Sequence, residues 1–186
     1  MRGSVGRYRV SQTRQAISVR YPAARVSGIG GFLRLFTMVC LPVLVLDQLT
    51  KYYIRSHLAL YQSIPVIPGW FDITFTLNPG AAFSMFVNAP AWFRSAFLFA
   101  LSGIAIAVLT ILLIRDSELN LTNFALALIL AGAGGNLIDR IRFGRVVDFI
   151  DWHYYGHHYP IFNMADSAIS IGVILIIGSS IFAPRS

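Results

Sequence analysis

Four apolar segments of membrane-spanning length limit what this chain can fold into. A helix of about 20 residues crosses about 30 Å of hydrocarbon, and the second segment alone is an uncharged run of that length. Only 12% of the residues are charged, against about 25% in soluble domains. The sequence therefore predicts an integral membrane protein, mainly α-helical. Its expected spans are residues 31–50, 95–114, 119–138 and 164–183.

The N-terminal region differs from the rest of the chain. Residues 1–30 are polar, rich in arginine and free of Asp and Glu, which is typical of a disordered basic arm or a transit peptide. Residues 31–186 are expected to form one four-helix membrane domain. The net charge of +7 does not come from a basic face interleaved with aromatic residues, so nucleic-acid binding is not expected.

Four spans place both ends of the membrane domain on one side of the membrane. That side would carry nine of the fifteen Lys and Arg residues, and the other side six. The positive-inside rule therefore predicts cytoplasmic termini, and the difference depends on the basic arm.

The two longer connections between the helices have strand patterns. Apolar and polar residues alternate over the eight positions 71–78, which is typical of a half-buried strand. The "NPG" at 78–80 then favours a turn. The β-branched stretch "RVVDFI", residues 145–150, is expected to pair with the first strand. The predicted fold class is therefore four transmembrane helices with a small extracytoplasmic β-sheet at the membrane surface.

Polar residues near the ends of the apolar segments form sets. Spacings of three and four residues place side chains on one face of a helix, and polar groups at membrane depth are costly and often functional. With the termini inside, the sets come to a common level at the outer ends of the helices. They are Asp47 and Lys51; Asn136, Asp139 and Arg140; Asn163 and Asp166; and Asp148 in the second strand.

The sets in the first and third helices also have a structural interpretation. Asp47 and Lys51 favour an ion pair that fixes a helix end. Asp139 and Arg140 favour a contact that ties the end of the third helix to the loop carrying the next aspartate of the chain.

The later acidic residues have structural alternatives too. Asp166 suits a helix cap, because Asp is preferred at helix N-termini. Asp148 suits a solvated strand residue, and Asp151 is expected to be one. The stretch "HYYGHH", residues 153–158, lacks metal-ligand spacing and is expected to be an interfacial loop, so no metal site is predicted.

Taken together, the carboxylates indicate a reaction. Two carboxyl groups in a partly dry site cannot both ionise easily, so one keeps a proton. An aspartic protease uses this arrangement, because the charged group draws a proton from water and the neutral group polarises the scissile carbonyl. No serine–histidine–aspartate set, activated cysteine or zinc motif competes, and no cofactor is required. Composition and spacing leave open which two aspartates form the pair.

Several sequence blocks carry a resemblance to a known family. They are "DQLTKYYI" at 47–54, "NPGAAFSMF" at 78–86, "GGNLIDRIRFGRVVDFID" at 134–151 and "FNMADSAISIG" at 162–172. In this order and between four spans, they resemble the bacterial lipoprotein signal peptidases, also called signal peptidase II. The resemblance covers residues 32–183, and the basic arm is longer than members of that family usually carry.

The resemblance implies an aspartic endopeptidase of the bacterial inner membrane with its active site at the outer leaflet. Such an enzyme removes signal peptides from diacylglyceryl-modified prolipoproteins by cleaving before the lipidated cysteine. The implied catalytic pair is Asp148 and Asp166. The positions implied to support the site or contact the substrate are Asn78, Gly80, Asn136, Asp139, Arg140, Asn163, Asp47 and Lys51.

The resemblance also implies partners. These are the prolipoprotein substrate, membrane lipid and the inhibitory peptide antibiotic globomycin, with no metal ion or organic cofactor. A mobile arm or short helix over the active site is implied, and a monomer is expected.

Two functions of other classes use the same residues. A small proton-coupled transporter or channel would place polar residues at mid-membrane on several helices, whereas the second span here has only Ser102 and Thr110. A non-catalytic lipid-binding or assembly subunit would tolerate the loss of either aspartate.

Overall fold

The computed structural model describes residues 28–80 and 90–182, so most of the basic arm lies outside the described residues. Within these ranges, four helical stretches are long and apolar enough to cross a membrane, as predicted. The first stretch, Ile29–His57, runs well past its predicted end at residue 50. The elements are α1 (Ile29–Leu35), the π-helical turn η1 (Phe36–Cys40), α2 (Leu41–His57), α3 (Ala91–Arg115), α4 (Leu121–Phe143) and α5 (Met164–Phe182).

The π-helical turn lies directly before a proline. The Leu41 N–H donates to the Phe36 carbonyl, five residues back, and Pro42 follows with no N–H to donate. The first span therefore remains helical across Pro42.

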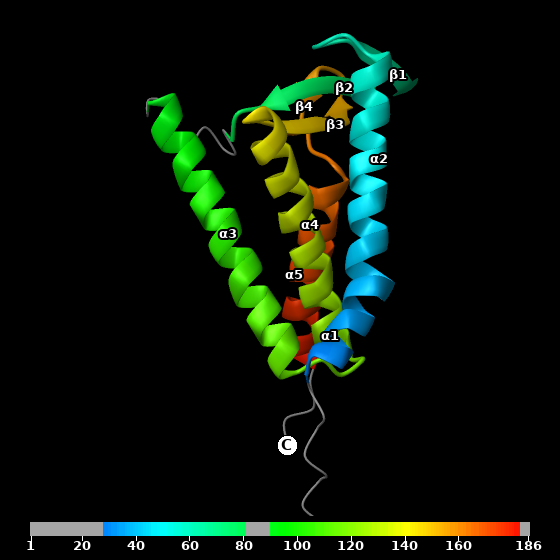
Figure 1. Cartoon of the computed structure of the whole chain (residues 1–186). Helices are drawn as coiled ribbons and strands as arrows, with labels where there is room; N and C mark the ends of the chain where they lie inside the picture. Colours follow the sequence, from blue (N-terminus) through cyan, green and yellow to red (C-terminus); the bar gives the residue numbers. More distant parts are fainter. Residues whose placement is uncertain (1–27, 81–89, 183–186) are drawn as a thin grey trace, which may run out of the picture.

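The helices lie side by side, and the sheet covers one end of them (Figure 1). The start of α1 and the end of α5 lie at the opposite end. Helix α3 diverges from α4 toward the sheet end (Figure 1). An even number of spans thus brings both described ends of the bundle together, far from the sheet.

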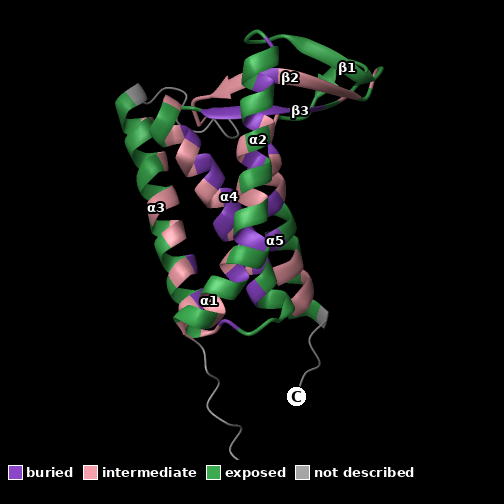
Figure 2. Cartoon of the chain, turned by 45° about the vertical axis from the view of Figure 1, so that its right-hand side comes forward, coloured by how far each residue is buried: buried purple, intermediate pink, exposed green. Residues whose placement is uncertain are grey.

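Helix α4 is the centre of the bundle (Figure 2). Half of its span is buried, against 11–17% of the other three. Small residues allow this, because a Cβ at Gly132 would overlap the Ala165 carbonyl of α5 and a Cβ at Gly172 would lie 2.7 Å from the Ala125 carbonyl. Close backbone contact of this kind is a common basis of helix packing in membranes.

The sheet has four antiparallel strands in the order β1-β2-β3-β4. They are β1 (Ser63–Ile67), β2 (Phe71–Asn78), β3 (Val146–Tyr154) and β4 (His157–His158). Both predicted strands and their pairing are confirmed. The apolar side chains Phe75, Val147 and Phe149 pack on Ile54 and Leu58 at the end of α2, which fixes the sheet on the helices.

Candidate active site

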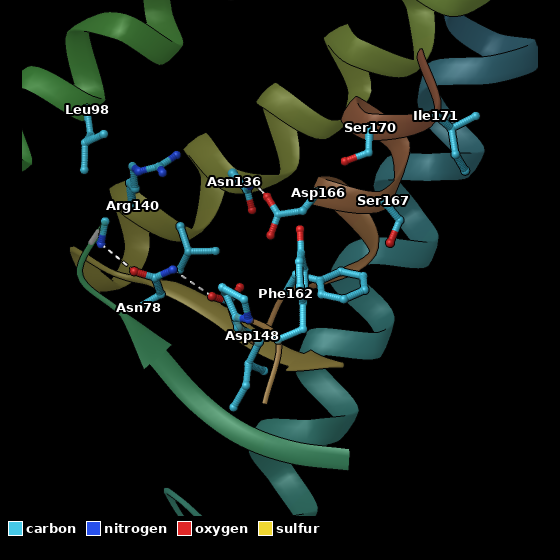
Figure 3. Close-up of a pocket in the computed structure, with 15 residues that line it drawn as sticks. Asn78, Leu98, Asn136, Arg140, Asp148, Phe162, Asp166, Ser167, Ser170 and Ile171 are labelled. Carbon is cyan, nitrogen blue, oxygen red and sulfur yellow. Dashed lines mark hydrogen bonds between the residues drawn. The ribbon is translucent and has the colours of Figure 1, made fainter. Parts of the chain in front are cut away.

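A cavity of about 550 Å³ lies at the sheet end of the bundle (Figure 3). Strand β3, helices α3, α4 and α5 and the segment before α5 contribute to its wall. Six of the ten predicted site residues line it, namely Asn78, Gly80, Asn136, Arg140, Asp148 and Asp166. Of the other four, Lys51 and Asn163 bond directly to residues of this set. Asp47 and Asp139 lie one step farther back and pair with Lys51.

Asp166 enters the cavity from the first turn of α5. Its backbone N–H donates to Asn163 Oδ1 at 2.9 Å, and its Oδ2 accepts from the Asn163 N–H at 3.3 Å. Asn163 directly precedes the helix, so it is the cap residue and Asp166 is its reciprocal partner three residues on. A helix cap is therefore present, as one interpretation of the sequence expected, but the capping residue is Asn163 and not Asp166. Asp166 Oδ1 also accepts a 2.7 Å bond from Asn136 of α4.

Asp148 enters the cavity from β3, where it pairs with Thr76 of β2. It is 1% exposed, so the alternative of a solvated strand residue is wrong. Asn78 Nδ2 donates to its Oδ2 at 2.9 Å, and Asn163 Nδ2 donates to its Oδ1 at 2.6 Å. Burial, and then the nearby Asp166 carboxylate, raise the pKa of Asp148 to about 7 against the lowering effect of these two donors. A carboxyl group here can hold a proton at neutral pH.

Two asparagine side chains join the two acidic groups. Asn163 Nδ2 approaches Asn136 Oδ1 at 3.2 Å in addition to Asp148, while Asn136 Nδ2 donates to Asp166. A hydrogen-bonded path therefore runs from one carboxyl group to the other. Both carboxyl groups point into the same cavity from different elements (Figure 3).

A buried ion cluster lies behind the asparagines. Lys51 Nζ lies 2.9 Å from Asp47 Oδ2 and 2.9 Å from Asp139 Oδ2, and it donates to Asn136 Oδ1 at 3.1 Å. These contacts use all three ammonium protons. The predicted pair of Asp47 and Lys51 is confirmed, and Asp139 is a second partner that links α2 to α4.

The same two carboxylates also hold backbone groups. Asp47 Oδ1 accepts from the Ala165 N–H of α5 at 2.9 Å, and Asp139 Oδ2 accepts from the Val147 N–H of β3 at 3.1 Å. The tie between the third span and the segment that carries Asp148 is thus confirmed for Asp139.

Arg140 does not make the predicted hydrogen bond to the segment that carries Asp148. Its guanidinium donates to Ser102 Oγ of α3 at 3.3 Å, so it contacts the second span rather than the β3 segment. It also lines the cavity. The side chain projects from α4 away from Asp139 because the two residues are neighbours in the helix and leave it in different directions.

The turn after β2 orients Asn78. The Gly80 N–H donates to Asn78 Oδ1 at 2.7 Å, so the Nδ2 group is the one directed at Asp148. Gly80 has φ of 94°, and a Cβ there would overlap Leu98 of α3. The positive φ favours glycine at this position, and a larger residue would also have to displace the Leu98 side chain.

Several residues in and around the site were not identified from the sequence. Gln48 Nε2 donates to Asp139 Oδ1 at 3.1 Å and to the Gly135 carbonyl at 3.3 Å. Its position directly after Asp47 is the sequence feature that could have identified it. The cavity also has a partly apolar wall, whose residues were not singled out as site residues from the sequence. It is formed by Leu98, Tyr159, Pro160, Ile161, Phe162, Ser167, Ser170 and Ile171.

The remaining acidic and histidine residues of the sheet lie outside the cavity wall. Asp151 is 3% exposed and accepts from Thr74 Oγ1 at 2.8 Å, with His158 Nδ1 at 2.7 Å, so the expectation of a solvated residue is wrong. His153 Nε2 lies 3.2 Å from Asp72 Oδ1, and this contact is the main cause of the lowered pKa of Asp72. These histidines belong to β3 and β4 rather than to a loop.

Known proteins resemble this chain over most of its length. Residues 39–182 match the family described as signal peptidase (SPase) II. The lipoprotein signal peptidase of Syntrophus aciditrophicus is 48% identical over 78% of this chain and 91% of its own length. That of Geobacter metallireducens is 47% identical over 77% of this chain and 88% of its own length.

A solved structure shows the same fold. It is a bacterial membrane enzyme determined by the in meso method at 1.9 Å resolution, with a TM-score of 0.69 and 37% identity over 84% of this chain and 96% of its own. The sequence match and the fold similarity agree with each other. The chain therefore belongs to the signal peptidase II family, the lipoprotein signal peptidases.

Proposed function

We propose that Asp148 and Asp166 are the catalytic pair with which this peptidase removes signal peptides from prolipoproteins. The supporting observation is that both carboxyl groups face one cavity, joined through Asn136 and Asn163, while the pKa of Asp148 is raised to about 7. One proton shared by the pair is the condition that aspartic proteolysis requires.

The reaction follows from the environments of the two groups. Asp166 accepts two N–H bonds near the N-terminus of α5, a place that favours negative charge, so it acts as the base. It takes a proton from a water molecule, whose oxygen attacks the scissile carbonyl carbon while Asp148 gives its proton to the carbonyl oxygen. The tetrahedral intermediate then collapses, the C–N bond breaks, and the leaving nitrogen takes the proton held by Asp166. Asp148 regains its proton from the hydroxyl of the intermediate.

The remaining predicted residues have supporting roles in this proposal. Asn78, Asn136 and Asn163 orient the two carboxyl groups through the bonds given above. Asp47, Lys51 and Asp139 hold the elements that carry them. Gly80 and Arg140 line the cavity beside the pair, and we assign them to contacts with the substrate backbone.

The substrate proposed is a diacylglyceryl-modified prolipoprotein, cut before its lipidated cysteine. One wall of the cavity belongs to α5, a membrane-spanning helix. Ile171 in that wall is 51% exposed, so the cavity reaches a surface that lipid covers. The acyl chains would remain in membrane lipid while the peptide bond reaches the aspartates. The peptide antibiotic globomycin would occupy the same cavity as an inhibitor.

The location follows from the fold and from charge. The chain is a multi-pass membrane protein, and we infer the bacterial inner membrane, cytoplasmic termini and an active site at the outer leaflet. The support is the excess of Lys and Arg on the side of the termini.

Substitution of the two aspartates tests the proposal. Asp148→Asn and Asp166→Asn should each lower the cleavage rate of a fluorescent diacylglyceryl lipopeptide by about 10³-fold or more, because neither amide can transfer the required proton. Asp72→Asn is the matched control, since this carboxylate belongs to the same sheet and lies outside the cavity wall. Cleavage near the parent rate by either cavity variant would exclude the pair.

A further inference from the structure

A second, smaller cavity of about 70 Å³ adjoins the first at the sheet end of α3 and α4. Its polar wall consists of Asn78, Ser95, Arg140 and Arg145, and the wall contains no acidic side chain. We call it the arginine cleft. Asn78, Leu98 and Arg140 line both cavities.

The cations of this region have no carboxylate partner in residues 28–80 and 90–182. The ion pairs there involve Lys51 and histidines only. Arg140 donates to a neutral hydroxyl, that of Ser102, although Asp166, Asp139 and Asp148 act on it from farther away. Arg94, the residue before Ser95, has a buried Nε without a hydrogen-bond partner. A guanidinium has five N–H donors, so these side chains retain capacity for an anion.

The position of the cleft narrows the choice of anion. It lies at the sheet end of two membrane-spanning helices, which is the level of the lipid headgroups whichever side of the membrane that end faces. Phe99 lines the cleft and is 49% exposed, so an apolar surface continues from it along α3. The diacylglyceryl group of the proposed substrate carries no charge and offers these arginines nothing to pair with.

We propose that the arginine cleft binds the phosphate of an anionic membrane phospholipid. Arg140 and Arg145 would donate charge-assisted hydrogen bonds to the phosphate oxygens, and the Ser95 hydroxyl would donate a third bond. One acyl chain would follow α3 past Phe99. The volume of the cleft suits one phosphate group and excludes a peptide segment.

Native mass spectrometry of the full-length protein in detergent tests this site. Phosphatidylglycerol and phosphatidylcholine of equal chain length are added at equal concentration, and retained lipid is counted. The parent should retain phosphatidylglycerol in preference, and Arg145→Gln should weaken its retention about tenfold. Ser95→Ala should weaken it less. The matched control is Arg142→Gln, an exposed arginine three residues earlier that does not line the cleft, and it should behave as the parent.

Two results of the lipid comparison would overturn the proposal. One is equal retention by Arg145→Gln and Arg142→Gln, and the other is no preference between the two lipids in the parent. A further arm adds sn-glycerol 1-phosphate, which should compete only at concentrations far above those of the lipid. Competition at equal concentration would identify a site for soluble phosphate instead. Peptidase activity is not measured, so the outcome is independent of the catalytic pair.

Discussion

At the scale of single residues, one ammonium group sets the direction of hydrogen bonding around the acidic pair. Lys51 carries donors only, so the Asn136 atom that it contacts must be the oxygen. The amide nitrogen of Asn136 then has to face Asp166. The Asn163 amide is oriented in the same way, because its oxygen accepts from the Asp166 N–H. Each carboxyl group therefore meets an N–H donor that it cannot lose by rotation of an amide.

Removing the Lys51 ammonium group should destabilise the folded protein. Lys51→Met leaves Asp47 and Asp139 buried without a counter-charge, and breaking a buried pair costs about 3–5 kcal/mol. We expect a lower unfolding temperature in detergent and loss of cleavage. Arg55→Gln, one helical turn later, is the control, because Arg55 is exposed and lies over the ring of Phe143 at 3.7 Å, outside the cluster. Equal stability of the two variants would mean that the cluster does not hold the site.

The raised pKa of Asp148 predicts how activity depends on pH. Cleavage needs a proton on Asp148, which is lost as pH rises through about 7. The value of kcat/KM should therefore fall about tenfold per pH unit above that point. A profile that stays flat to pH 9 would show that Asp148 does not supply the proton.

The raised pKa of Asp148 also makes the free energy of unfolding depend on pH. A pKa raised by folding means that the folded state binds the proton more tightly than the unfolded state. The stabilisation that this proton gives to the folded state is complete below the ordinary pKa of 3.8 and is lost as pH rises to about 7. The free energy of unfolding falls over this range by at most about 1.4 kcal/mol per pH unit. Thermal unfolding of the parent and of Asp148→Asn from pH 5 to 8 should show this dependence only in the parent.

The sequence indicated most of these residues but not their contacts. Spacing of three and four residues placed Asp47 with Lys51, and the structure confirms that pair. Spacing could not show that Asp139 completes the cluster, because that contact joins two helices. The buried state of Asp151 was missed for the same reason, since its partners Thr74 and His158 come from neighbouring strands.

At the scale of elements, close packing between α4 and α5 positions the two halves of the site. Asn136 lies on α4 and Asp166 lies on α5, so the hydrogen bond between them depends on the separation of the helices. Gly132 lies one turn from Asn136 and has no room for a Cβ, because the Ala165 carbonyl occupies that place.

A pair of glycine substitutions separates this packing from intrinsic helix preference. Gly132→Ala should destabilise the protein by about 1–3 kcal/mol, because the added methyl forces the helices apart. Gly103→Ala on α3 should be neutral or stabilising, since nothing lies within 4 Å of its Cβ position and alanine favours a helix. Unfolding in detergent measures both, and equal effects would contradict the packing argument.

Elements were easier to predict than their ends. The alternation of residues 71–78 gave β2 its correct range, because a strand of period two has a distinct pattern. The end of the first span was placed seven residues early, since "DQLTKYY" reads as polar while Asp47 and Lys51 are buried and neutralise each other. Gly144, with φ of 66°, ends α4 and directs the chain into β3.

At the scale of the whole molecule, most of the buried polar groups gather at the sheet end of the bundle, with Ser117 and Asn123 at the other end. A transporter would need such groups along its length, and Ser102 of α3 instead contacts Arg140 near that end. Membership of a peptidase family also decides against a non-catalytic subunit. The arrangement suits a reaction at one surface of the membrane on a substrate anchored in it.

The orientation of the molecule can be tested with single thiols. The native Cys40 is fully buried, so the parent should not react with a membrane-impermeant maleimide. His157→Cys lies on exposed β4 at the sheet end, and Glu118→Cys lies in the exposed connection between α3 and α4 at the opposite end. Because the termini are proposed to be cytoplasmic, intact spheroplasts should label the cysteine at position 157 and leave that at 118 unlabelled until lysis. The reverse pattern would place the aspartate pair at the inner leaflet, where the lipidated cysteine of an exported prolipoprotein could not reach it.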